Sequence, residues 1–325
     1  MKSQIICVLG GTGFVGRHLV NGLTEAGYRV RIPTRRRARH RDLLVNPRVN
    51  LVEADVHDPA ALAEQLAGCR AAINLIGILN ETGHDGSGFR RAHVALAEKL
   101  VRAARDQGVA RLLHMSALNA DADIEHGYYL KTKGEAEDLV HGAARDGLQV
   151  TSFRPSVIFG PGDSFFTRFA TLLRWTPWLL PLACAEARFA PVYVGDVAAA
   201  FRHALGDKST VGRRYELCGP HSYTLGQLVE YTARTAGLKR RVMALGDGLS
   251  HLQARVLEYA PGKPFSLDNY YSLQKDSVCT GADLQGLGIT PTALEAVVPL
   301  YLGAQSSRAR YSLARRLAGR EEGGS

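Results

Sequence analysis

Short apolar runs alternate with amphipathic stretches through the first half of the chain. Apolar runs of this kind, bounded by turn residues, predict buried strands at residues 5–9, 28–32, 49–54, 71–78, 111–115 and 150–153. Between them, apolar residues recur three or four positions apart, which predicts helices at residues 17–23, 59–66, 92–104 and 133–144. Alternation of strands and helices favours an α/β fold with a doubly wound parallel sheet, the Rossmann arrangement.

The pattern changes after Arg154-Pro155, where proline, tryptophan and phenylalanine become frequent. Strand and helix character then return at residues 192–194, 197–205 and 215–217. This interruption predicts a smaller C-terminal substrate lobe whose segments interleave with the core. The predicted parts are a dinucleotide-binding core at residues 1–155 and 191–220, a lobe at 156–190 and 221–304, and a flexible basic tail at 305–325.

The first predicted strand runs directly into a glycine-rich turn and a helix. This context is the one that a dinucleotide-binding fingerprint requires, and a turn that binds nothing is the less favoured alternative. Glycines allow a tight turn, close approach of the backbone to a pyrophosphate, and close packing of the helix. The helix N-terminus then offers free N–H groups to the phosphates. The predicted contacts are Gly10, Gly11, Thr12, Gly13, Phe14, Val15 and Gly16.

The end of the second predicted strand bears on the choice of cofactor. Proteins that select NAD place an acidic residue there, to bind the ribose hydroxyls. This chain has Thr34, Arg35 and Arg36 instead, and no acid before Asp42. Because a guanidinium binds a phosphate bidentately, we expect NADP(H) to be preferred over NAD(H). A solvated basic loop is one alternative, and a nucleic-acid patch is disfavoured because no stacking aromatics lie among these arginines.

The ends of the next two predicted strands also face the expected ligand crevice, because ligands of open parallel sheets bind at the carboxyl ends of the strands. Asp55 and Val56 are candidates to hold the adenine. The candidates beside the cofactor ribose are Asn74, Leu75, Ile76 and Gly77. Ordinary turn chemistry is the alternative, and it explains Gly77 better than Asp55.

A tyrosine and a lysine four residues apart are the candidate catalytic pair. Tyr129 and Lys133 share one face of a predicted helix, and an ammonium beside a phenol lowers its pKa. Such a tyrosine can exchange a proton with a substrate oxygen. Ser116, at the end of the fifth strand, is expected to orient that oxygen. Tyr128 is a weaker candidate, because the residue four positions on is Thr132, which carries no charge.

Several phrases of the sequence resemble the extended or atypical short-chain dehydrogenase/reductase superfamily, of the NAD-dependent epimerase/dehydratase type. They are the glycine loop, Ser116, the Tyr129–Lys133 pair with Glu137, and the segments 154–160 and 191–197. The resemblance implies that Tyr129 is the acid/base, that Lys133 tunes it and holds the nicotinamide ribose, and that Ser116 is the catalytic serine. It also implies cofactor contacts at Met115, Pro155, Ser156, Val157 and Ile158. One departure is the short segment between Ser116 and Tyr129, which brings the reach of Ser116 into question.

Four further phrases, at residues 114–120, 159–165, 215–220 and 289–294, resemble a narrower branch. That branch holds the nucleotide-binding accessory subunit of respiratory complex I and its bacterial relatives. The resemblance implies association with a respiratory complex or a membrane surface. It also implies a second function class, because the complex I member resembles a structural binder of NADPH more than a catalyst.

Charge and cysteine content narrow the setting. The formal net charge of +9 is concentrated at residues 29–41 and 308–320. The five cysteines show no metal-ligand or redox spacing, so reduced thiols in a reducing compartment are expected. The first strand begins close to the start of the sequence, so no leader is expected, and the longest apolar stretch, 165–185, holds two arginines and two prolines. We therefore expect a cytoplasmic protein or one peripheral to the inner face of a membrane.

Three groups of residues keep two interpretations each. Trp175, Trp178 and the phenylalanines near them suit a hydrophobic pocket or a membrane, or simply core packing. His93 suits the adenine, although a histidine on the helix surface is the commoner case. The arginines after residue 307 suit an anionic lipid or a partner, with a solvated tail as the default.

Together these patterns predict an NADP(H)-dependent oxidoreductase acting on a carbonyl or alcohol, of hydrophobic or quinone-like character. The first alternative is a non-catalytic NADP(H)-binding accessory protein. The second is a nucleotide-sugar epimerase or dehydratase, although no basic pocket for a second nucleotide is evident.

Overall fold

The computed structural model describes residues 5–176, 178–260 and 263–303. Within these ranges seven strands form one parallel sheet, in the order β11-β6-β5-β4-β1-β2-β3. The strands are β1 (Ile5–Leu9), β2 (Arg29–Thr34), β3 (Val49–Glu53), β4 (Ala71–Asn74), β5 (Arg111–Met115), β6 (Gln149–Pro155) and β11 (Arg214–Leu217). The predicted doubly wound α/β fold is confirmed.

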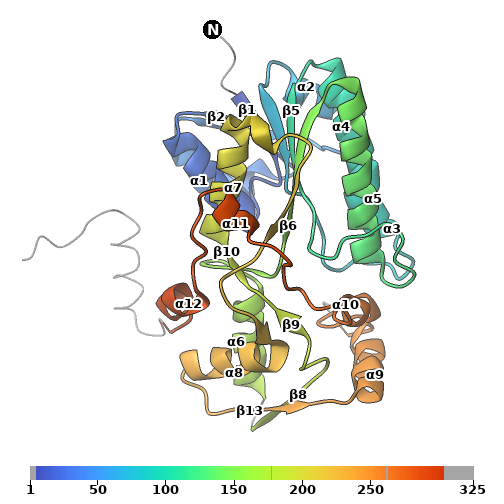
Figure 1. Ribbon diagram of the computed structural model, residues 1–325, viewed down its shortest axis with the longest axis vertical. Coiled ribbons are helices and arrows are strands. Elements are labelled where there is room, and N and C mark those ends of the chain that lie inside the picture. The colour runs from blue at the N-terminus through green and yellow to red at the C-terminus, as the bar shows by residue number, and fades with distance from the viewer. Residues whose placement is uncertain (1–4, 177, 261–262, 304–325) are drawn as a thin grey trace, which may run out of the picture.

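Helices cover both faces of this sheet (Figure 1). On one face α1 (Phe14–Glu25) packs against α7 (Val194–Gly206), and their apolar sides share a core cluster with β1, β2 and β6. The other face is covered by α2 (Pro59–Leu66), α4 (Leu96–Asp106) and α5 (Tyr128–Gly142). Shorter elements connect them: η1 (Arg37–Val45), α3 (Ser87–Arg90), the π-helical η2 (Arg91–Ala95), η3 (Ala143–Asp146), η4 (Lys208–Thr210) and α11 (Asp283–Gly286).

Two predicted boundaries differ from the structure for local physical reasons. The strand predicted at residues 71–78 ends at Asn74, whose side-chain oxygen accepts a hydrogen bond from Ile76 N and turns the chain. The helix predicted at 133–144 begins five residues earlier, at Tyr128. Its first N–H groups donate to Asp268, which lies 140 positions further along the chain. A cap supplied from so far away leaves no local signal in the sequence.

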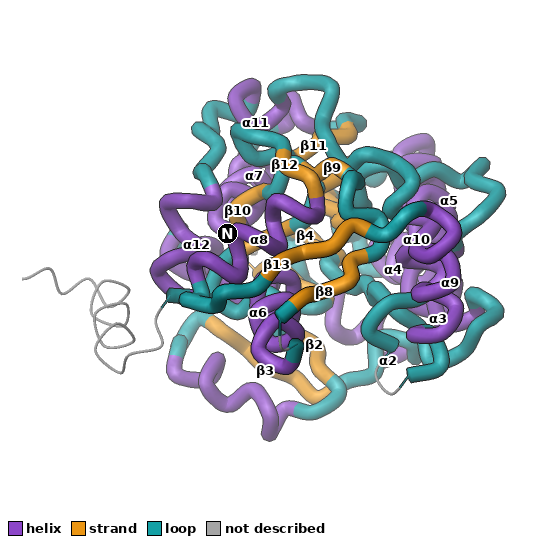
Figure 2. The backbone as a smooth tube through the Cα atoms, turned by 90° about the horizontal axis from the view of Figure 1, so that it is seen from below, coloured by secondary structure: helices purple, strands orange, loops and turns teal. Residues whose placement is uncertain are grey.

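A smaller lobe extends from the carboxyl ends of the strands (Figures 1 and 2). Phe159, Phe166, Leu228 and Val298 lie in its separate hydrophobic core. Its helices are α6 (Phe165–Trp175), α8 (Leu225–Thr235), α9 (Asp247–Leu257), α10 (Leu267–Ser272) and α12 (Leu294–Leu302). Its short strands are β7 (Ile158–Phe159), β8 (Leu179–Leu182), β9 (Arg188–Phe189), β10 (Val192–Tyr193), β12 (Tyr223–Thr224) and β13 (Arg241–Ala244). The predicted part boundaries stay a prediction, and the tail at 305–325 lies outside the described residues.

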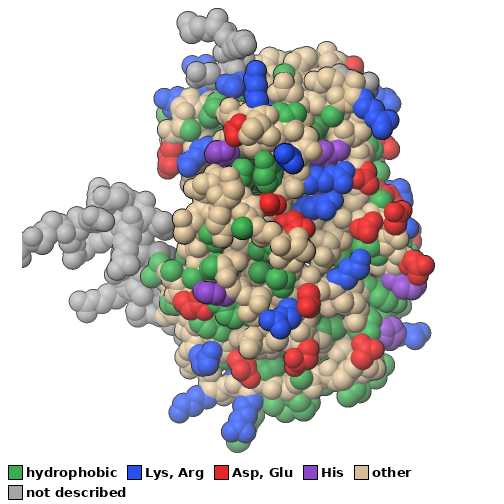
Figure 3. Space-filling model, viewed as in Figure 1, with side chains coloured by type: hydrophobic (Ala, Val, Ile, Leu, Met, Phe, Trp, Pro, Cys, Tyr) green, Lys and Arg blue, Asp and Glu red, His purple; other side chains and the backbone are tan. Residues whose placement is uncertain are grey.

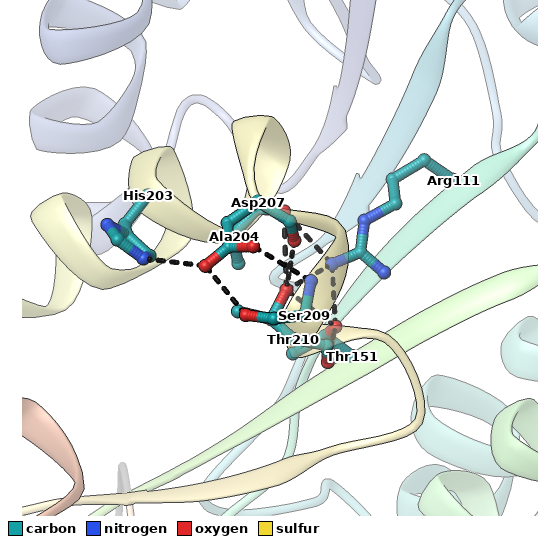
Figure 4. A network of polar contacts seen from close by, with 7 residues as sticks. All are labelled: Arg111, Thr151, His203, Ala204, Asp207, Ser209 and Thr210. Carbon is teal, nitrogen blue, oxygen red and sulfur yellow. Dashed lines mark hydrogen bonds and ion pairs between the residues drawn. The ribbon is translucent and has the colours of Figure 1, made fainter. Parts of the chain in front are cut away.

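A buried arginine joins the sheet to the segment that returns to it (Figure 4). Arg111 in β5 is only 6% exposed, and burial lowers its pKa to about 10, so it is a cation at neutral pH. One terminal nitrogen donates to Thr151 Oγ1 at 2.6 Å, to Thr210 Oγ1 at 2.8 Å and to the Ala204 carbonyl at 3.0 Å. These contacts fix the end of α7 against β5 and β6, and so position the lobe segments that follow.

The expectation of reduced cysteines throughout is wrong. Cys218, just after β11, forms a disulfide with Cys279, 61 positions further along the chain. The segment around Cys279 returns along the end of β11, where Thr280 N donates to the Glu216 carboxylate. Because tertiary folding alone brings the two thiols together, their spacing carried no signal. Among the described residues no helix is long and apolar enough to cross a membrane.

Candidate active site

The glycine loop lies where the strand order of the sheet reverses. β1 has β4 on one side and β2 on the other, so the loop after β1 opens at the switch point, where open α/β sheets bind ligands. Gly10 has φ +79°, a left-handed conformation that favours glycine. A Cβ on Gly16 would lie 2.3 Å from the Gly10 carbonyl oxygen and 2.6 Å from Gly11 Cα. Gly16 therefore allows the helix to pack against the loop itself.

The residues of this loop fit a dinucleotide. The first turn of α1 follows Gly13, and no side chain caps it, so its N–H groups remain available for phosphate oxygens. Arg17 braces the loop, because its Nε donates to the Thr12 carbonyl at 3.1 Å while its guanidinium pairs with Asp42. That pairing lowers the pKa of Asp42. Arg17 was not predicted as a residue of this site, although its position one turn into α1 could have indicated it.

The end of β2 carries both signs of charge. Arg35 and Arg36 are exposed, whereas Thr34 is buried and pairs in register with Glu53 of β3. Glu53 accepts a hydrogen bond from Arg37 N at 3.1 Å. The strand pairing thus brings an acidic residue beside β2 that the linear sequence did not reveal. Asp42 pairs with Arg17, and Arg35 and Arg36 are both exposed to solvent.

The candidates after β3 and β4 mostly shape the strand ends. Asp55 is exposed and its carboxylate accepts from His57 N at 2.9 Å, while Val56 is buried. Asn74 is 1% exposed and its amide nitrogen lies 3.3 Å from His114 Nδ1. Leu75 contributes the backbone that a Cβ on Gly10 would touch. Their predicted cofactor contacts stay predictions.

Tyr129 and Lys133 occupy the start of α5, where the two lie in a largely buried environment. Lys133 is 3% exposed and its Nζ donates to the Met115 carbonyl at 3.0 Å. Burial lowers the Lys133 pKa to about 8. Burial and the nearby charge of Asp268 raise the pKa of Tyr129 to about 12. The expected lowering of the tyrosine pKa is therefore wrong for the protein alone, because burial and the charge of Asp268 both raise it.

His93 is the third member of this group. It is 2% exposed, so the expectation that it lies on a helix surface is wrong. Its Nε2 accepts from Ile78 N at 3.3 Å, and its Nδ1 lies 2.8 Å from Thr132 Oγ1. Burial lowers the His93 pKa to about 2, which keeps the ring neutral. Its ring meets that of Tyr129 edge-on, with the centroids 5.7 Å apart.

Gly77 brings β4 into the same group. A Cβ at this position would lie 3.0 Å from Lys133 Nζ and 3.6 Å from His93 Nε2. The residue therefore allows the lysine and the histidine to approach the backbone after β4. The structure thus places Tyr129, His93, Lys133 and Gly77 side by side at the carboxyl ends of β4 and β5.

Ser116 belongs to a buried network below this group. It is 2% exposed, and its hydroxyl donates to Glu137 Oε2 at 3.0 Å. Glu137 is completely buried and also binds Arg154 Nε at 2.8 Å and the Ser152 hydroxyl. The Ser116 hydroxyl thus donates to Glu137 in this arrangement, and its role in orienting a substrate oxygen stays a prediction. A charged carboxylate that needs burial partners explains why the serine turns inward.

The segment after β6 is fixed by its own neighbours. Ser156 N donates to the Leu217 carbonyl, and its hydroxyl donates to the Ser277 carbonyl at 2.7 Å. The Pro155 and Val157 carbonyls accept from Leu118 N and Val192 N. Ile158 of β7 pairs with Val192 of β10. These contacts hold residues 155–158 between the core and the lobe, and their predicted contact with a nicotinamide stays a prediction.

A cavity of about 300 Å³ opens beside the start of α5. Its apolar lining comes from Phe89, Tyr128, Tyr259 and Leu267. Its polar lining includes Asp268, whose Oδ1 accepts from Tyr129 N at 3.0 Å. The cavity thus lies between the core and the α9–α10 part of the lobe. One of its lining residues, Tyr128, directly precedes Tyr129.

A family model described as the NAD dependent epimerase/dehydratase family matches residues 6–226. The chain belongs to this family. Membership supports binding of a nicotinamide dinucleotide by the glycine loop. A dTDP-glucose 4,6-dehydratase from Streptomyces venezuelae, solved with NAD bound, shares the fold with a TM-score of 0.72 at 21% identity, over 95% of this chain and 99% of that one.

Two relatives also confirm the narrower resemblance. The chain is 28% identical over 312 residues to the mitochondrial NADH-ubiquinone oxidoreductase 40 kDa subunit of Neurospora crassa, over 94% of this chain and 80% of that protein. It is 32% identical over 253 residues to a ceramide reductase of Caulobacter vibrioides, over 75% of this chain and 74% of that protein.

Proposed function

We propose that this protein is an NADP(H)-dependent reductase of a hydrophobic carbonyl compound, with Tyr129 as proton donor. The observation that carries the proposal is the grouping of Tyr129, Lys133 and His93 at the carboxyl ends of β4 and β5. A ceramide reductase among the relatives supports reduction of a long-chain substrate. The apolar lining of the adjacent cavity supports the same class of substrate.

Tyr129 suits the direction of reduction. With a pKa near 12 it carries its proton at neutral pH and can donate it to a carbonyl oxygen. Bound NADPH supplies a hydride to the carbonyl carbon. Lys133, mostly protonated below pH 8, stabilises the phenolate that remains after proton transfer and has N–H groups beyond the one bound to Met115. Neutral His93 packs on the tyrosine ring and limits its orientation.

The preference for NADP(H) rests on Arg35 and Arg36. Both are exposed at the carboxyl end of β2, and the acidic residues nearest in the sequence and the sheet, Asp42 and Glu53, are already bound. The exposed guanidinium groups can bind a 2′-phosphate bidentately, and this capacity supports the preference for NADP(H). Replacement of both arginines by glutamine weakens NADPH binding and leaves NADH binding nearly unchanged, which titration calorimetry measures.

Two tyrosines adjacent in sequence provide the test of the chemistry. Tyr129→Phe removes the proposed proton donor, and Tyr128→Phe removes a hydroxyl from the neighbouring exposed ring. NADPH oxidation is followed with long-chain ketones, aldehydes and quinones. We expect Tyr129→Phe to lose at least about a hundredfold in kcat with NADPH binding retained, and Tyr128→Phe to lose little. Equal rates for the two variants would contradict the proposal.

A second candidate is a non-catalytic NADP(H)-binding subunit of a respiratory complex. Two observations favour it: the 40 kDa subunit is matched over 94% of this chain, and Ser116 is withdrawn into the buried network. If the protein binds NADPH but does not oxidise it with any of the carbonyl compounds tested, this candidate is favoured. Co-purification with complex I subunits from the native cell, lost in a glycine-loop variant, would establish it.

A further inference from the structure

Exposed apolar side chains gather at the end of the smaller lobe that lies farthest from the sheet. We call this the distal face and define it by α9, by β8 and β13, by Trp175 at the end of α6 and by Trp178 directly before β8. The two indoles are 84% and 81% exposed, although tryptophan is usually covered in folded proteins. Figures 1 and 2 agree in placing β8, β13 and α9 at this end.

The strand pair has a defined outer side. β8 and β13 run parallel, with Leu179 opposite Arg241 and Pro181 opposite Met243. Alternate residues Leu180 and Leu182 are buried in the core of the lobe. The period of two in a strand therefore turns Leu179, Pro181, Arg241 and Met243 outward as one surface.

The tryptophans are held in this exposed position. Arg240 Nε donates to the Leu173 carbonyl at 3.1 Å and to the Thr176 carbonyl at 2.7 Å, which closes the end of α6. Arg241 N donates to the Trp178 carbonyl at 3.2 Å. The backbone on both sides of residue 177 is thus tied to the start of β13. Hydrogen bonds therefore hold the backbone beside each of the two indoles.

The helix α9 continues the surface. Gln253 and Ser250 face β8, where they bind Ala183 N and Cys184 N. Leu249, Leu252 and Val256 lie on the other side of the helix and are 54–61% exposed. An amphipathic helix normally buries such a stripe, so in the described structure this one lacks a cover.

The charges around these apolar residues are mainly positive. Described residues 171–176, 178–182 and 238–258 carry two acids, Asp247 and Glu258, against the basic residues Arg174, Lys239, Arg240, Arg241 and Arg255. Three of these cations and Trp178 line a hollow of about 440 Å³. In Figure 3 basic and hydrophobic side chains lie at this lower end, with acidic side chains among them.

We propose that the distal face docks this protein on an anionic lipid bilayer, with Trp175 and Trp178 in the interfacial layer. Tryptophan favours the boundary between headgroups and acyl chains, and cations beside it are attracted to anionic headgroups. A bilayer fits better than a second copy of the chain. A two-fold interface through this face would bring together two surfaces that both carry an excess of cations.

The protein offers its own reporter for this docking. Its sequence contains two tryptophans, and both lie on the distal face. Vesicles of phosphatidylcholine that contain about 30% of the anionic lipid phosphatidylglycerol are added to the full chain. We expect a blue shift of tryptophan emission and co-sedimentation, both reversed by high salt. Vesicles of phosphatidylcholine alone bind far less.

A charge-reversal variant and a matched control separate this face from net charge. Lys239→Glu with Arg241→Glu changes two exposed cations of the distal face. Arg70→Glu with Arg102→Glu changes two exposed cations of the core by the same amount. At about fivefold per cation, the first pair weakens vesicle binding by at least about 25-fold and the second by much less. Unfolding temperatures show whether each variant is folded.

Three results would overturn the proposal. The first is an emission spectrum that anionic vesicles leave unchanged, and the second is an equal loss of vesicle binding in the two charge variants. The third is a protein that binds no vesicles but forms a dimer, which Trp175→Ala with Trp178→Ala converts to a monomer. None of these measurements involves NADPH or turnover. Failure of the docking proposal is therefore distinguishable from failure of the proposed reductase activity.

Discussion

Two glycines of the same helix give the sharpest test of the nucleotide site. Gly16 and Gly22 both lie within α1. A Cβ on Gly16 would lie 2.3 Å from the Gly10 carbonyl oxygen, about 1 Å inside ordinary contact, and the atoms in the way are backbone. A Cβ on Gly22 would meet its nearest atom, Arg202 Nη1, at 3.6 Å, which is ordinary contact. The same substitution therefore distorts the loop at one position and leaves it intact at the other.

The expected magnitudes follow from these contacts. Alanine in place of a helical glycine stabilises by about 1 kcal/mol, which is the full effect expected for Gly22→Ala. At Gly16 the overlap costs about 1–3 kcal/mol more than that gain and moves the loop N–H groups. NADPH at a hundred times its Kd adds about 2.7 kcal/mol to wild-type stability. For a chain of this length that is a rise of about 4 °C in Tm.

Differential scanning fluorimetry with and without NADPH measures both effects. Gly22→Ala should keep the NADPH-induced rise in Tm at a slightly higher baseline. Gly16→Ala should show a rise below about 1 °C. A normal NADPH-induced rise in the folded Gly16→Ala variant would refute the assignment of the nucleotide to this loop.

Three further predictions concern a buried carboxylate, the disulfide and a buried lysine. Glu137→Ala leaves Arg154 without its carboxylate and should lower stability by about 3–5 kcal/mol, and Glu137→Gln by less, as measured by denaturant unfolding. Reduction of the Cys218–Cys279 disulfide should lower stability by about 4 kcal/mol, and no change in Tm on reduction would contradict its presence. Lys133 has a folded-state pKa of about 8 against 10.5 when unfolded, so the unfolded chain holds more protons in that window. Stability should rise with pH from about 8 to 10.5, and Lys133→Met should remove that component of the slope.

Local sequence patterns were sufficient for the core. The bounds of β1, β5 and α2 coincide with those predicted, because apolar runs and a proline at the first helical turn act within each segment. The lobe was harder to foresee. Its strands are short and its core is assembled from segments about 140 residues apart, such as Phe159 and Val298.

The candidate site was only half visible in the sequence. The glycine loop and the Tyr129–Lys133 pair could be found because their spacing is local. Asp268, which caps the helix that bears Tyr129, and Glu53, which joins the end of β2, arrive through tertiary folding. Ser116 lies at the expected strand end, yet its hydroxyl donates a hydrogen bond to the buried Glu137, which the local sequence did not reveal.

The most direct measurement of the central claim is a crystal structure of the protein with NADPH. The account predicts the diphosphate on the N–H groups at the start of α1, the 2′-phosphate beside Arg35 and Arg36, and the nicotinamide facing Tyr129. A nucleotide bound elsewhere, or a nicotinamide turned away from Tyr129 and Lys133, would contradict it.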